Sequence, residues 1–263
     1  MKIWAVANQK GGVGKTTTAV SLAGVLHNRH ANVLLVDLDP HGSLTSYFRL
    51  DPDNISLSGY DLFLQTQDMQ AVIRKTTFEH IHVLPASSAL ATLDRQLGAK
   101  DGMGLVIKKA LAQVNTIYDY AILDCPPMLG LLMVNALAAC ERLLIPVQTE
   151  FLALKGLERM VNTLNMIQTA RKQNIIQTIV PTFFDQRLNA SVDSLKILRE
   201  TYNATIWEGL IPIDTQFRDA SSLGLPLTVK HPSCRGSRAY SNLLDYLIGE
   251  QQLETLATGS DVL

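Results

Sequence analysis

A glycine-rich turn between an apolar run and a helical pattern constrains the fold of this chain most strongly. Residues 2–8, KIWAVAN, form a short apolar run, and residues 15–29 are amphipathic with helical spacing. Between them the chain reads QKGGVGKTT. A strand that enters a helix through glycines can turn its backbone N–H groups towards phosphate oxygens, and the helix N-terminus adds positive potential. The stretch therefore predicts a phosphate-binding loop in an α/β fold.

The loop departs at one position from the pattern GxxxxGK[ST] of phosphate-binding loops. Gln9 stands where that pattern has its first glycine, although the later glycines and the strand–loop–helix order fit it. A dinucleotide-binding GxGxxG loop is the competing interpretation. It fails because, counted from Gly12 and Gly14, the last position of that pattern falls on Thr17.

Two lysines stand in this loop, where a phosphate-binding loop requires one. Lys15 is the lysine of the pattern, and we expect it to reach the β- and γ-phosphates of a nucleotide. The hydroxyl of the neighbouring Thr16 is expected to ligate Mg²⁺. The pattern assigns no part to the second lysine, Lys10.

Short apolar, β-branched runs alternate with amphipathic stretches along the rest of the chain. Most runs are nearly continuous, as in parallel strands that are buried on both faces. We expect strands at 2–8, 32–39, 81–86, 119–125, 142–148, 175–184 and 205–212. We expect helices at 15–29, 88–98, 103–114, 129–140, 154–172, 190–201 and 236–249. The alternation predicts a doubly wound, mostly parallel α/β sheet with helices on both faces. We expect one domain over 1–250 and a flexible tail over 251–263.

Three aspartates stand at the ends of two expected strands. Asp37 and Asp39 end the run LLVDLDP, and Asp124 ends the strand in YAILDCPP. Ligands of doubly wound sheets bind at the carboxyl ends of the strands, so these side chains should share a crevice with the glycine-rich loop. There they can hold the hydration shell of Mg²⁺ or orient an attacking water. Capping of the following loops is the alternative, but three carboxylates converging on one crevice favour a functional site.

Composition excludes several classes of protein. The formal net charge is −1, so any binding to nucleic acid or to an anionic membrane must come from a local patch. The three cysteines show no CxxC spacing, which is typical of a reducing compartment. No apolar run approaches the roughly 20 residues that a membrane span requires.

Several segments together resemble the ParA/MinD family of deviant-Walker ATPases, and within it the ParA (Soj-like) branch. They are KGGVGKTT, LLVDLDP, DCPP and LIPVQTEFLALKGL, with TFFDQR, IPIDTQFRDA and CRGSRAY further along. The similarity extends from residue 2 to about residue 249. The resemblance implies a P-loop NTPase fold, ATP and Mg²⁺ as cofactors, and slow hydrolysis of ATP.

The resemblance also implies a role for each matched position in the nucleotide site. Asp39 is the residue that activates water for attack on the γ-phosphate, and Asp37 and Asp124 support the Mg²⁺ shell together with Thr16. Pro212 and the PTFFD segment lie where the family contacts adenine. The implied nucleotide-binding residues are Lys10, Gly11, Gly12, Val13, Gly14, Lys15, Thr16, Thr17 and Pro212.

The same resemblance gives the second lysine a part. Lys10 matches the signature lysine of the family, which reaches across a dimer that encloses two ATP molecules and contacts the partner's nucleotide. Lys10, Lys15 and Asp39 are therefore the implied catalytic residues. A cation supplied by a partner makes hydrolysis depend on dimerisation, as an arginine finger does in other NTPases.

Family members differ in the surface on which they act. ParA-like members bind DNA non-specifically through basic side chains. Arg187 matches one DNA-contacting arginine of the family, and Arg218 and Arg235 are further basic candidates for DNA contacts. A second arginine of the family falls on Gln216 in this chain. The polar segment LIGEQQLETLATGSDVL lacks the basic amphipathic pattern of the MinD-like members, so membrane binding is not expected.

The cargo is left open by the sequence. His41-Gly42-Ser43 replaces the Gln-Gly-Asn of usual partition ATPases, which is similar to the relatives that place chemotaxis arrays at cell poles. Chromosome or plasmid partition is the other possibility. The expected activator is accordingly a ParB-like protein or a chemotaxis-array adaptor, and the expected location is cytoplasmic, on the nucleoid or at a pole. A metabolic P-loop enzyme such as a dethiobiotin-synthase-like ligase is the alternative function.

Overall fold

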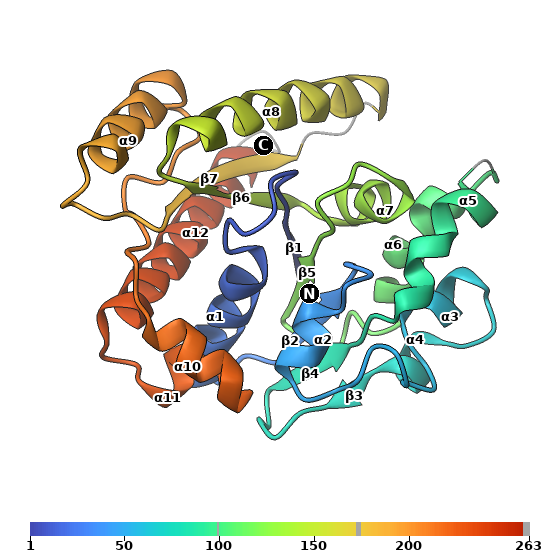
Figure 1. The fold of residues 1–263 in the computed structure, drawn as a ribbon. Coiled ribbons are helices and arrows are strands. Elements are labelled where there is room, and N and C mark those ends of the chain that lie inside the picture. Colours follow the sequence, from blue (N-terminus) through green and yellow to red (C-terminus); the bar gives the residue numbers. More distant parts are fainter. Residues whose placement is uncertain (99, 172–174, 260–263) are drawn as a thin grey trace.

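The computed structural model describes residues 1–98, 100–171 and 175–259, which contain one seven-stranded sheet (Figure 1). The strands lie in the order β3-β4-β2-β5-β1-β6-β7. All pairs are parallel except that of β3 with β4 at one edge. The strands are β1 (Lys2–Val6), β2 (Val33–Asp37), β3 (Arg74–Lys75), β4 (Ile81–Leu84), β5 (Tyr120–Asp124), β6 (Arg142–Gln148) and β7 (Ile176–Thr182).

Helices connect the strands. Before β5 these are α1 (Lys15–Asn28), α2 (Ser43–Tyr47), α3 (Gly59–Phe63), α4 (Met69–Val72), η1 (Ser88–Thr92), α5 (Leu93–Leu97), η2 (Met103–Leu105) and α6 (Val106–Ala112), of which η1 and η2 are short 3-10 helices. After β5 they are α7 (Leu131–Ala139), α8 (Phe151–Arg171), α9 (Asn189–Thr201), α10 (Gln216–Leu223), α11 (Leu227–Lys230) and α12 (Arg235–Gly259).

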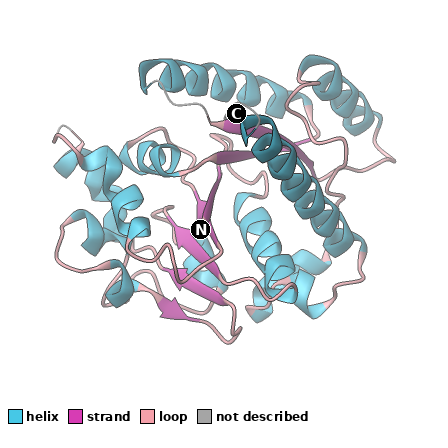
Figure 2. Cartoon of the chain, turned by 180° about the vertical axis from the view of Figure 1, so that it is seen from behind, coloured by secondary structure: helices cyan, strands magenta, loops and turns pink. Residues whose placement is uncertain are grey.

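Two apolar layers enclose the sheet, because alternate residues of each strand face opposite sides. In β1, Trp4 and Val6 belong to the layer that α1 and α12 complete. Ala5 belongs to the other layer, with residues of α6, α7 and α8. Figure 2 shows α1 and α12 side by side on one face of the sheet. The doubly wound architecture expected from the sequence is confirmed.

One expected strand is wrong. Residues 205–212 form only isolated bridges, Ile179 with Ile206 and Phe184 with Pro212. The indole of Trp207 folds over Gly209, where a Cβ would come within 2.2 Å of the ring. Pro212 has no N–H to donate to a ladder, so the apolar segment follows β7 without extending the sheet.

The helical expectations differ from the structure mainly in the short elements. The helices α2, α3, α4, α10 and α11 were not expected, since segments of four to eight residues carry little periodicity. The helix α12 extends to Gly259, into the range 251–263 for which we expected a tail. Residue 172, the end of one expected helix, and residues 260–263 lie outside the described residues.

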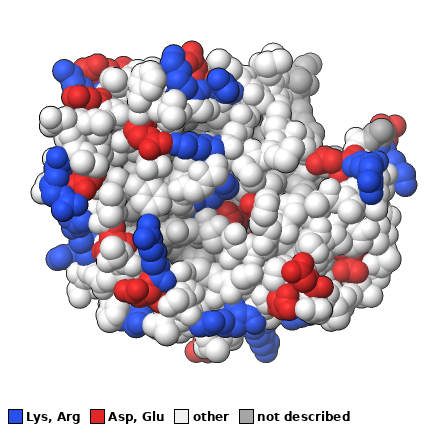
Figure 3. Space-filling view, in the orientation of Figure 1, with Lys and Arg blue, Asp and Glu red and all other residues white. Residues whose placement is uncertain are grey.

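The carboxyl ends of the central strands bring the predicted site together. Asp124 lies opposite Asp37 in the β2–β5 ladder and opposite Val6 in the β1–β5 ladder. The glycine-rich loop after β1 therefore stands next to both aspartates. Figure 3 shows acidic and basic side chains at the bottom of a hollow near the centre of this face. Within the described residues, no helix has the length and apolar character needed to cross a membrane.

Candidate nucleotide site

The glycine-rich loop takes a backbone conformation that requires glycine at two positions. Gly12 has φ +74° and Gly14 has φ +92°, both in the left-handed region. The helix α1 begins at Lys15, directly after Gly14, and the N–H of Thr18 donates to the carbonyl of Gly14 at 2.8 Å. Free N–H groups of the first helical turn thus face the end of the sheet, where a phosphate can accept from them.

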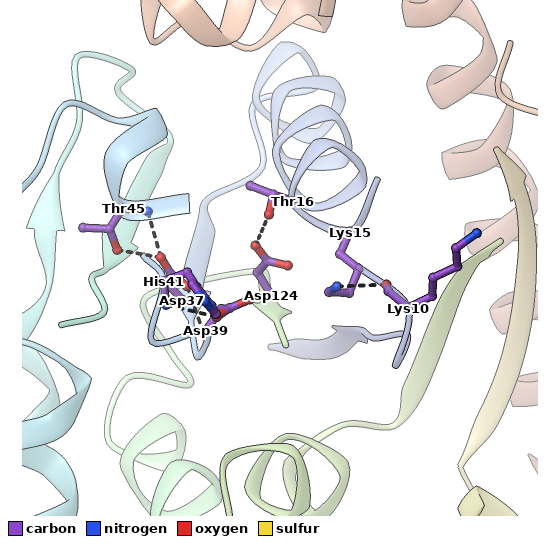
Figure 4. A network of polar contacts seen from close by, with 8 residues as sticks. All are labelled: Lys10, Lys15, Thr16, Asp37, Asp39, His41, Thr45 and Asp124. Carbon is purple, nitrogen blue, oxygen red and sulfur yellow. Dashed lines mark hydrogen bonds and ion pairs between the residues drawn. The ribbon is translucent and has the colours of Figure 1, made fainter. Parts of the chain in front are cut away.

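The two lysines of the loop point in different directions (Figure 4). Lys15 is 8% exposed, and its Nζ lies 3.5 Å from the carbonyl oxygen of Lys10, towards the inside of the loop. The side chain of Lys10 leaves the loop on the far side from Asp124 and forms an ion pair with Glu150. The N–H of Lys10 donates to Asn8 Oδ1 at 2.9 Å, which fixes its backbone.

Asp124 lies buried beside the first turn of α1. Its Oδ2 accepts a hydrogen bond from the Thr16 hydroxyl at 2.6 Å, whereas Oδ1 is buried and has no hydrogen-bond partner among the described residues. Burial, and secondly the nearby charge of Asp37, raises the pKa of Asp124 to about 8. An unpaired buried carboxylate oxygen is costly unless a cation or a water meets it.

Asp37 holds the loop that follows β2. Its Oδ2 accepts from both the N–H and the hydroxyl of Thr45, at 2.8 and 2.6 Å. Its Oδ1 accepts from the N–H of Asp39 at 3.1 Å. Burial raises the pKa of Asp37 to about 6, against the lowering effect of these hydrogen bonds. Both oxygens are therefore engaged by the protein, which favours support of the metal shell over direct ligation.

Asp39 lies at the rim of the crevice with its side chain 14% exposed. Its Oδ1 accepts from the N–H of His41 at 3.0 Å and lies 2.8 Å from His41 Nδ1. Figure 4 shows Asp37, Asp39 and His41 gathered at the end of β2, on the Asp124 side of the glycine-rich loop. The three predicted aspartates and the predicted loop are thus brought together.

The segment expected to contact adenine lies against the glycine-rich loop. Gly14, Thr17, Phe183 and Pro212 line the same small gap between the loop and the end of β7. The Phe183 ring lies 3.6 Å from the position of a Cβ on Gly14, and Phe183 itself has φ +53°. The Thr182 hydroxyl donates to the carbonyl of Val13 at 3.0 Å. Sequence reasoning identified the segment but not the contact of Phe183 with the loop.

Two of the three arginines expected as DNA contacts share a surface hollow. Arg187 and Arg235 line a hollow of about 820 Å³ together with Arg238. Arg187 forms a bidentate ion pair with Asp185, at 2.9 and 2.7 Å. Arg218 lies on α10 and is not among the lining residues. Figure 3 shows Lys and Arg side chains along this edge of the molecule, beside the loop between β7 and α9.

The donors present fit a magnesium ion held jointly with phosphate. The described residues contain no group of three or more His, Cys, Asp or Glu side chains arranged to hold a metal. A hydroxyl at the first turn of the helix and a buried carboxylate with a free oxygen, on Thr16 and Asp124, are instead the donors expected when phosphate oxygens complete the shell. The chemistry of the site therefore matches Mg²⁺ bound with a nucleotide.

Residues 1–177 match the model of a family described as an AAA domain. The chain is 36% identical over 243 residues to the sporulation initiation inhibitor protein Soj of Bacillus subtilis, covering 92% of this chain and 96% of Soj. It is 33% identical over 240 residues to the chromosome partitioning protein ParA of Myxococcus xanthus, covering 91% and 85%. The chain belongs to the Soj/ParA family of AAA-domain proteins. The ParA branch expected from the sequence is confirmed.

A solved structure shows the same fold. The structure of cobyrinic acid a,c-diamide synthase from Mycobacterium smegmatis, with bound ATP analogue and magnesium, is 32% identical to this chain. It superposes with a TM-score of 0.84 and covers 96% of both chains. This likeness confirms the P-loop NTPase fold expected from the sequence.

Proposed function

We propose that this chain is a Mg²⁺-dependent ATPase of the Soj/ParA type that positions or segregates intracellular cargo. The observation that carries the proposal is the contact between Thr16 and Asp124 at 2.6 Å, with the second Asp124 oxygen buried and unpaired. This pair stands beside Lys15 at the carboxyl ends of β1 and β5, where a doubly wound sheet binds its ligand. A solved relative that is similar over 96% of this chain holds an ATP analogue and magnesium.

The geometry supports a division of labour within the site. Lys15 and the N–H groups of the loop bind the β- and γ-phosphates and offset their charge. Thr16 and Asp124 would hold Mg²⁺, which when bound neutralises charge that develops on the phosphate oxygens. Asp37 fixes the loop after β2, and Asp39 on that loop orients the attacking water and takes up its proton.

The direction of the Lys10 side chain supports a role for this residue in dimerisation. Its side chain points away from its own Lys15 and Asp124 and towards Glu150 at the start of α8 (Figure 4). We propose that it contacts the nucleotide of a second copy across a symmetric interface, so that hydrolysis is slow and depends on the dimer. The exposed apolar side chains of Phe151 and Leu152, 65% and 71% exposed, stand beside Glu150 on that side.

The proposal extends to the partners. Arg187, Arg235 and Arg238 line one hollow together with Asp185, which pairs with Arg187, and we propose that this basic lining contacts DNA phosphates non-specifically. We propose a cytoplasmic protein, on the nucleoid or at a pole, that acts with a ParB-like activator or a chemotaxis-array adaptor. The relative named chromosome partitioning protein ParA supports partition, and His41-Gly42-Ser43 supports array placement.

A metabolic ligase is the alternative, since one similar structure carries the name of a diamide synthase. Such an enzyme turns over ATP only with its small acid substrate. Hydrolysis of ATP by the purified chain without any added acid therefore separates the two functions.

The direct test is ATP binding and turnover by the wild type and by Lys15→Ala. The wild type should bind MgATP and release phosphate slowly without an added small acid. The variant should lose binding by at least about 100-fold, because it removes the buried cation at the phosphates. Undiminished ATP affinity in Lys15→Ala would refute the assignment of the nucleotide site.

A further inference from the structure

The loop after β2 places a histidine against the side chain that we assign to water activation. His41 Nδ1 lies 2.8 Å from Asp39 Oδ1, and the His41 N–H donates to the same oxygen at 3.0 Å. The His41 side chain is 80% exposed, so it does not pack in a core. Its contact with Asp39 is the one side-chain hydrogen bond that it makes in the described part of the chain.

The direction of this hydrogen bond follows from the chemistry of its acceptor. An ionised carboxylate has no proton to give, so His41 Nδ1 must carry the proton and donate it. Oδ1 of Asp39 then receives two N–H groups. The other oxygen, Oδ2, accepts no hydrogen bond from the described residues.

Hydrogen bonds on both sides hold the turn between the two residues. The N–H of Gly42 donates to the carbonyl of Asp39 at 2.8 Å, which closes a turn with Pro40 in its second position. Gly42 has φ +62°, and a Cβ there would come within 2.6 Å of Pro52. On the other side, the N–H of Asp39 is held by Asp37. The turn therefore fixes the backbone that places the imidazole on Asp39.

We propose that His41 is a positioning residue for ATP hydrolysis. Two donors on Oδ1 restrict rotation of the Asp39 carboxylate and leave Oδ2 directed at the water. With the backbone donor alone, the carboxylate can turn and share both oxygens between the backbone N–H and solvent. This inference rests on the proposed function, because it assumes that Asp39 acts on the attacking water.

Three variants at one position separate the hydrogen bond from the size of the ring. In His41→Ala, kcat for MgATP should fall about tenfold, while the dissociation constant of ATP stays within about twofold. His41→Asn carries a side-chain N–H at the same number of bonds as Nδ1 and should recover most of the rate. His41→Phe keeps the ring without a donor and should remain as slow as alanine.

His30→Ala is the matched control, because His30 is an exposed histidine before β2, at the opposite end of that strand from Asp39. Its kcat should equal that of the wild type. Wild-type turnover in His41→Ala, or recovery by phenylalanine but not by asparagine, would overturn the positioning role and leave the proposed function intact. A wild-type protein that binds MgATP and never hydrolyses it would overturn both.

Discussion

At the scale of single residues, Asp124 is buried, and its Oδ1 has no hydrogen-bond partner among the described residues. Its carboxyl is 1% exposed, and its pKa is raised to about 8 by burial and by Asp37. An unfolded aspartate titrates near 3.8, so between about pH 4 and 8 the folded protein holds a proton that the unfolded chain releases. Stability from this group is present at low pH and is lost as the pH rises towards 8.

The residue-scale prediction compares the wild type with Asp124→Asn, both without nucleotide. Asparagine is neutral at every pH, so the variant should gain thermal stability relative to the wild type as the pH rises from 5 to 8. Melting temperatures at pH 5, 6.5 and 8 measure the difference. A difference that stays constant over this range would show that Asp124 does not retain its proton in the folded state.

The sequence alone did not predict contacts between side chains that are far apart in the chain. The loop pattern identified Lys15 and Thr16, because their spacing is set by one turn of backbone, and the family resemblance identified Lys10. Glu150 stands 140 residues from Lys10, and no local pattern joins them. Phe183 in the left-handed region was likewise hidden, since phenylalanine rarely adopts that conformation.

At the scale of elements, the packing of α1 against α11 is unusually close. A Cβ on Gly24 would lie 2.1 Å from the Thr228 hydroxyl and 2.9 Å from Pro226 Cβ. That hydroxyl donates to the carbonyl of Ser21 at 3.0 Å in a buried position. The helix α1, which begins at the nucleotide site, thus packs tightly against α11, a short helix that hydrophobic periodicity did not predict.

The element-scale prediction is that Gly24→Ala lowers the free energy of unfolding by about 2–3 kcal/mol, from overpacking and a disturbed buried hydrogen bond. Gly156→Ala is the matched control, since a Cβ added to Gly156 in α8 would meet no atom within 4 Å. It should instead stabilise the protein by up to about 1 kcal/mol through helix propensity. Urea unfolding measures the free energy of unfolding of both variants. If Gly24→Ala leaves that free energy unchanged, α11 can move away from α1.

The same scale shows where pattern reasoning works. Strands β1, β2, β5 and β6 were predictable because they are buried on both faces and read as continuous apolar runs. Residues 205–212 are also largely apolar, but they pair only through isolated bridges. Composition alone does not predict that the Trp207 ring packs over Gly209.

At the scale of the whole molecule, the site of one chain is incomplete for the chemistry that we propose. Lys15, Thr16 and the three aspartates face one crevice, whereas the Lys10 side chain leaves it (Figure 4). We therefore propose that a second copy supplies a cation at the γ-phosphate. Asp39→Ala should slow hydrolysis and so allow the ATP-bound dimer to accumulate.

Sedimentation of Asp39→Ala with and without MgATP tests this central claim most directly. We predict a monomer without nucleotide, a dimer with MgATP, and a monomer that still binds ATP when Lys10→Ala is added to the same chain. A monomer of Asp39→Ala at saturating MgATP, or a dimer that forms equally well without Lys10, would contradict it.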